Sequence, residues 1–182
     1  MLATSVAVKL RAADIADYFL WLANDTGSFM SNLKLQKLVY YAQAWHLALY
    51  DRPLFDEDFQ AWIHGPVIPE LFYKYQHFGW KPIDEDVHVD LPEPIVKHLE
   101  EVADEYFSCD GYELERMSCT EDPWQRARDG LARDQVSENI IDQKWIEEYY
   151  KTRVEENSLR KWSWNPSNNA EARRSQLFFQ VS

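Results

Sequence analysis

Apolar and polar residues alternate along the chain mainly with the period of an α-helix. The longest apolar stripe runs between positions 31 and 50, with a repeat of three or four residues that places side chains on one helix face. Ser31 is a suitable N-cap, because its hydroxyl can accept a hydrogen bond from an amide of the first turn. Pro53 ends the pattern. The stripe consists of Leu35, Leu38, Val39, Ala42, Trp45, His46 and Leu49.

A short stretch after this helix has the period of a β-strand. Phe59, Ala61 and Ile63 alternate there with Gln60, Trp62 and His64. Successive side chains of a strand point to opposite faces, so Trp62 and His64 are predicted on the face opposite to the apolar one. The pair Gly65-Pro66 is typical of a turn that leads from the strand to a helix opened by Pro69. This turn is either only a rigid connection or also a place where amides of the helix N-terminus meet an anionic group.

Further helices are predicted on both sides of this stretch. The segment 84–90 alternates acidic or polar residues with valines, which predicts a short edge strand or an extended loop. Outside the segment 84–90, the pattern predicts a mainly α fold, a compact helical domain with a small β-hairpin or short sheet element. The other helices are expected over 12–24, over 69–78 with Gly79 as its cap, after Pro92 or Pro94, over 111–117, after Pro123, and after the N-cap Asp142.

The length of 182 residues suits one globular domain followed by a tail. We predict a helical domain over 1–155 and a C-terminal tail over 156–182. The tail is too apolar for a plain linker, so we expect it either to dock on the domain or to bind another chain, which leaves a homodimer open. Its apolar residues are Trp162, Trp164, Leu177, Phe178, Phe179 and Val181.

The chain is acidic, with 19 Lys and Arg against 31 Asp and Glu and a net charge of −12. Such a charge opposes binding to nucleic acid, and no helix-turn-helix with a basic recognition helix is visible, so a DNA-binding autoregulator is not expected. It favours a cationic protein partner. We expect no membrane span, no signal peptide and, from two cysteines without a metal or disulfide spacing, a cytoplasmic protein.

Two kinds of enzyme site were considered, and neither has a recognisable motif. A nucleophile would be Cys109 or Cys119 with a histidine, which needs a lowered thiol pKa. A metal site would combine His88 with its acidic neighbours on one face of the stretch 84–90, namely Asp84, Asp86 and Asp90. A packed thiol and a solvated acidic face are the simpler interpretations, so no catalytic residue, metal or cofactor is expected. A small metal-dependent or Cys/His enzyme using His64, His88 or Cys119 stays as the alternative.

Two separated stretches resemble the Panacea domain of SocA-like antitoxins and phage-associated GepA-like proteins. They are LKLQKLVYYAQAWHLALYDRPLF and QAWIHGPVIPELFYKYQHFG, with the Lys-Leu-x-Tyr-Tyr-Ala-Gln core and the Gly-Pro-Val-x-Pro turn in order. A weaker similarity continues to about Tyr150 and keeps Pro123, Trp124 and Ala127 in register. The family pattern leads us to expect a Ser/Thr-His pair before Pro-Trp, but here the pair is Ser118-Cys119.

The resemblance implies an antitoxin that neutralises a cognate toxin by direct protein contact, or an adaptor that delivers the toxin to the ClpXP protease. An acidic, aromatic surface around Trp62, His64 and Gly65-Pro66 is the hypothesis for the contact. Tyr41 has the chemistry of an interface hot spot, although core packing is the better explanation for an aromatic residue at helical spacing. Lys37 opposes the dipole of its helix, so we expect it to pair with a carboxylate, first of all in an internal salt bridge. The predicted partner-binding residues are Lys37, Tyr41, Trp62, His64, Gly65 and Pro66.

Overall fold

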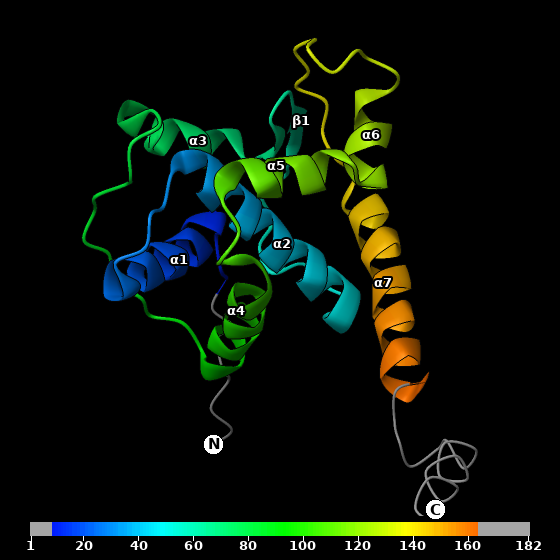
Figure 1. Cartoon of the computed structure of the whole chain (residues 1–182), viewed down its shortest axis with the longest axis horizontal. Helices are drawn as coiled ribbons and strands as arrows, with labels where there is room; N and C mark the ends of the chain where they lie inside the picture. Colours follow the sequence, from blue (N-terminus) through cyan, green and yellow to red (C-terminus); the bar gives the residue numbers. More distant parts are fainter. Residues whose placement is uncertain (1–8, 164–182) are drawn as a thin grey trace, which may run out of the picture.

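The computed structural model describes residues 9–163 and shows helices gathered around one central helix, α2 (Asn32–Tyr50) (Figure 1). Because neighbours enclose α2, even polar side chains such as Gln36, Lys37 and Gln43 are buried. The mainly helical fold with a small hairpin is confirmed. The helices packed against α2 are α1 (Ala12–Thr26), α3 (Pro69–Lys74), α4 (Glu93–Tyr106), α5 (Gly111–Cys119) and α7 (Gln143–Ser163).

Local signals in the sequence account for most helix ends. Ser31 caps α2, its hydroxyl accepting from the Lys34 amide at 3.2 Å, and Asp110 caps α5 in the same way. The helix α6 (Asp122–Arg128) has Pro123 in its first turn. The single helix expected over 69–78 is instead α3 followed by the 3₁₀ helix η1 (Gln76–Phe78), which ends at Gly79.

The β element is a two-stranded antiparallel hairpin of β1 (Gln60–Trp62) and β2 (Gly65–Val67). Gly65 and Pro66 therefore begin the second strand, and the prediction that they turn from the strand into a helix is wrong. The turn is made by Ile63 and His64. The other edge of β1 pairs with the segment 139–141, through backbone hydrogen bonds from the Ala61 amide to Asn139 and from the Ile141 amide to Phe59, both 2.8 Å.

The stretch 84–90 is an extended loop rather than a strand. Its polar side chains face solvent, and the two valines pack against the core. The predicted alternation is therefore present, but no neighbouring strand pairs with this backbone within the part of the chain that the structure describes.

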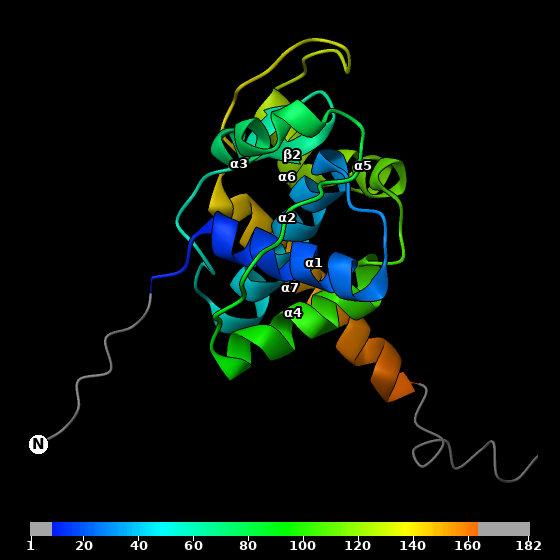
Figure 2. The same ribbon diagram turned by 90° about the vertical axis from the view of Figure 1, so that its left-hand side faces the viewer.

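The hairpin and α3 lie at one end of the molecule, and α4 lies at the other (Figures 1 and 2). Helix α7 crosses α2 and continues to Ser163, beyond the predicted domain boundary at 155. The apolar tail residues named above have their side chains outside the described part of the chain, so the boundary and the role of the tail stay predictions. None of the helices described here has the length and apolar character needed to cross a membrane.

Candidate functional site

The hairpin is held in place by side chains of the helices behind it. Three of its backbone carbonyl groups accept hydrogen bonds from side chains of α2 and α6 that are at least nine-tenths buried. Each donor is polar, and leaving it unpaired in the core would lower the stability of the fold. The contacts therefore position both the hairpin and the donor side chains. The pairs are Lys37 Nζ to Pro66 (2.9 Å), Trp124 Nε1 to Trp62 (2.9 Å) and Arg128 Nη1 to Ala61 (3.1 Å).

Lys37 is fully buried and binds a carbonyl oxygen rather than a carboxylate. The predicted internal salt bridge is therefore wrong. Burial lowers the pKa of the Lys37 amine to about 7, since the charged form loses its water. A peptide carbonyl is an adequate partner for an amine in this state, which explains how a lysine is tolerated in the core.

Three positions far apart in the sequence meet at Gly65. Its φ of +95° is a conformation that residues with a Cβ rarely adopt, and a Cβ there would lie 2.8 Å from Ser118 Oγ and 3.0 Å from Lys37 Nζ. Only glycine fits between the lysine and the serine. The Lys-Leu-x-Tyr-Tyr-Ala-Gln core, the Gly-Pro pair and the Ser118 position are therefore parts of one packing arrangement.

Of the six predicted partner-binding residues, four are buried in the structure and two are accessible to solvent. Lys37 is buried behind the hairpin, and Gly65 and Pro66 are buried within its second strand, so none of the three is available to a partner. Tyr41 is 1% exposed and stacks on Tyr106 at 4.0 Å, so it is a core residue. Trp62 is half-buried and His64 is exposed. These last two are the members that a second protein can touch.

Around Trp62 and His64 lie residues that form what we call the hairpin surface. The Trp62 ring packs edge-on against Phe72 at 5.1 Å and lies 6.2 Å from Tyr73, which is 57% exposed. His64 Nδ1 lies 3.1 Å from Glu115 Oε1. Arg133 approaches the same carboxylate at 3.8 Å. The hairpin surface comprises Trp62, His64, Tyr73, Glu115 and Arg133.

Sequence reasoning missed Glu115 and Arg133. Neither belongs to the strand pattern, and they reach the hairpin only because α5 and the loop 129–140 fold back beside it. No local signal in the sequence could have assigned them, whereas Tyr73 was visible as an aromatic residue close to the Gly-Pro motif.

Neither of the two cysteines nor His88 has the environment that enzyme chemistry needs. Cys119 is 3% exposed with its Sγ 4.0 Å from the Ile63 carbonyl oxygen, and burial raises its pKa to about 11, so the thiol stays protonated at neutral pH. Burial also raises the pKa of Cys109. His88 and its acidic neighbours face solvent on the loop, and across residues 9–163 no three His, Cys, Asp or Glu side chains gather as metal ligands.

These contacts define a mainly helical domain in which one hairpin is fixed by buried side chains and keeps Trp62 and His64 accessible to solvent. A family model described as antitoxin SocA-like, Panacea domain, matches residues 35–125, which is half of the chain. The protein therefore belongs to the SocA-like Panacea-domain family of antitoxins. Comparison with curated proteins and with solved structures found no match. Among the described residues, the matched span contains every side chain that binds a hairpin carbonyl except Arg128.

The hydrogen bond from Trp124 to the hairpin can be tested by Trp124→Phe. Phenylalanine keeps a ring beneath the Arg128 guanidinium, which lies 4.9 Å from the Trp124 centroid, but it loses the N–H that binds the Trp62 carbonyl. We expect a loss of about 1–2 kcal/mol in the free energy of unfolding, measured by urea denaturation. Trp80→Phe, at a side chain that is 63% exposed, is the control and should change little. Equal stability of the two variants would contradict the role given to this bond.

Proposed function

We propose that this protein is an antitoxin that neutralises a cognate toxin by direct contact through the hairpin surface. The observation that carries the proposal is the accessible pair Trp62 and His64 on a hairpin backbone held by three buried donors, with the exposed Tyr73 of α3 beside Trp62. A surface that is already ordered loses little conformational entropy when it binds, so more of the contact energy appears as affinity. Tryptophan and tyrosine are also the residues most enriched at the energetic centres of interfaces.

The charge of the chain indicates the kind of toxin surface that would fit. A net charge of −12 favours encounter with a cationic protein through long-range attraction. At the hairpin surface the Glu115 carboxylate already contacts His64 and Arg133, so the long-range attraction comes from the charge of the chain as a whole. We therefore expect toxin association to slow as salt is raised, whereas the aromatic contacts chiefly control dissociation.

Trp62→Ala is expected to weaken toxin binding about 30-fold, the loss of about 2 kcal/mol typical of an interface hot spot. His64→Ala, at an exposed position, should have a smaller effect. Affinity is measured by calorimetry or surface plasmon resonance with the product of the adjacent gene, after urea denaturation has shown that each variant is folded.

The matched control is Trp80→Ala. Trp80 is an exposed aromatic residue in a different place, a cleft that it lines with Phe29 and Tyr112 beside the start of α5. Unchanged affinity in Trp62→Ala and His64→Ala would exclude the hairpin surface. A loss of affinity confined to Trp80→Ala would indicate that the toxin contacts that cleft instead.

Occlusion of the toxin and its delivery to ClpXP predict different toxin levels. Co-expression with the toxin, with a tag only on this chain, should yield a stable stoichiometric complex and restore growth if the antitoxin acts by occlusion. Growth that is restored with loss of the toxin, and that depends on the protease, would instead support delivery.

A further inference from the structure

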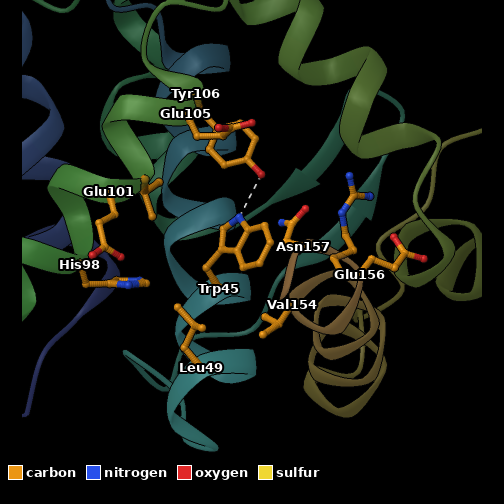
Figure 3. A pocket seen from close by; sticks show the side chains of 11 residues that line it. Trp45, Leu49, His98, Glu101, Glu105, Tyr106, Val154, Glu156 and Asn157 are labelled. Carbon is orange, nitrogen blue, oxygen red and sulfur yellow. Dashed lines mark hydrogen bonds between the residues drawn. The ribbon is translucent and has the colours of Figure 1, made fainter. Parts of the chain in front are cut away.

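A groove of about 700 Å³ lies between α4 and α7, with the C-terminal half of α2 as its floor (Figure 3). The floor is apolar and partly open to solvent, because Trp45 is half-buried and Leu49 is 42% exposed. Val102 of α4 and Val154 of α7 line the walls. The volume is within the range of pockets that hold small ligands.

The rim of the groove is acidic. Glu101 and Glu105 project from α4, and Glu156 projects from α7 (Figure 3). Arg153 contributes a guanidinium to the lining, and its Nη1 donates to the Tyr149 hydroxyl at 2.8 Å. Within residues 9–157, none of the three carboxylates pairs with a lysine or arginine. The groove therefore suits an occupant that carries positive charge next to large apolar side chains.

The chain itself contains such a segment after α7. Residues 164–182 include Arg173 and Arg174, followed closely by the apolar run 177–179, Leu-Phe-Phe. This order places two cations beside three large apolar side chains, which is the chemistry that the rim and the floor of the groove require.

The segment also begins close enough to reach the groove. Ser163 ends α7 six residues beyond Asn157, which lines the groove, so it lies about 9 Å further along the helix. The fourteen residues from Ser163 to Leu177 extend to at most about 45 Å, which is far more than the return requires.

We infer that the segment 164–182 docks in this groove of its own chain, with Arg173 and Arg174 against the glutamates of the rim and residues 177–179 on Trp45 and Leu49. The covalent tether favours this occupant over a separate protein, because it supplies a high effective concentration. The inference does not rest on the proposed antitoxin function and requires no toxin.

Disulfide trapping in the full-length protein tests the docking. Leu49→Cys is combined with Phe178→Cys in a Cys109→Ser background, and intramolecular disulfide formation under mild oxidation is followed by mass spectrometry. The control pair combines Phe178→Cys with Val136→Cys, a position that is 78% exposed in the loop 129–140 at the other end of the molecule (Figure 1). We expect the Leu49 pair to form at least tenfold faster than the Val136 pair.

A charge exchange provides the second readout. Arg173→Glu with Arg174→Glu should slow trapping of the Leu49 pair about tenfold, and adding Glu101→Lys with Glu105→Lys should restore it. Equal rates for the Leu49 and Val136 pairs would overturn the inference. Disulfides that form only between molecules, at a rate that rises with concentration, would also overturn it and assign the groove to a second copy.

Discussion

Gly65→Ala is expected to lower the free energy of unfolding by about 4 kcal/mol, the combined cost of an unfavourable backbone conformation and of overpacking. The new Cβ would stand 2.8 Å from Ser118 Oγ and 3.0 Å from both Lys37 Cε and Lys37 Nζ. Lys37 is fully buried and its amine binds the Pro66 carbonyl, so it has little freedom to move aside. Urea denaturation of the purified variant measures the loss.

Gly79→Ala is the matched control for this substitution. Gly79 also has a positive φ, +57°, but a Cβ there would have no neighbour within 4 Å. Only the backbone cost of a sparsely populated conformation, about 1–3 kcal/mol, should therefore remain. If the two variants lose the same stability, the contact between Lys37, Gly65 and Ser118 does not constrain the fold as described.

Glu121→Gln is expected to remove a large pH dependence of stability. Glu121 is 4% exposed and accepts hydrogen bonds from Tyr40 at 3.0 Å and Tyr150 at 2.8 Å. Burial raises the pKa of its carboxyl from 4.5 to about 7, because the charged form loses its water. Between these values the folded state holds a proton that the unfolded state has released. Stability due to this group is therefore greatest below pH 4.5 and falls as the pH rises to 7.

The expected slope is about 1.4 kcal/mol per pH unit, which amounts to about 3 kcal/mol over the window. Glutamine does not titrate, so the difference in unfolding free energy between Glu121→Gln and the unsubstituted protein should shift by that amount in favour of the variant from pH 4.5 to 7. Denaturation curves at intervals of half a pH unit measure it. Glu148→Gln, at an exposed carboxylate, is the control and should follow the unsubstituted protein. Parallel curves for Glu121→Gln would contradict the raised pKa.

The sequence was informative about local elements and about one face of the hairpin. The stripe and the Ser31 cap predicted α2 with its correct start, because caps and helical periodicity depend on residues within a few positions of each other. The alternation in β1 identified Trp62 and His64 as sharing the polar face. They are the two predicted contact residues that remain accessible.

Long-range partners could not be predicted in this way. The stripe on α2 suggested one buried face, but the helix is enclosed, and its polar residues bind the backbone of distant segments. Gln36 accepts from the Ile68 amide at 3.0 Å, and Gln43 donates to the Phe55 carbonyl at 2.8 Å. Periodicity shows that a position is polar, but not which carbonyl or amide will meet it when other elements pack around the helix.

The Gly-Pro pair shows the same limit most clearly. In a local sequence pattern glycine and proline usually mark turns, so the pattern predicts a turn at Gly65 and Pro66. In the structure they form a strand, because Lys37 binds the Pro66 carbonyl and the space beside Ser118 admits no Cβ. Local patterns in the sequence predicted most of the helices, the Ser31 cap and the outward face of β1. The second strand, the burial of Lys37 and the position of Glu115 and Arg133 beside the hairpin could not be predicted in this way. Each depends on contacts between distant segments that only the complete fold brings together.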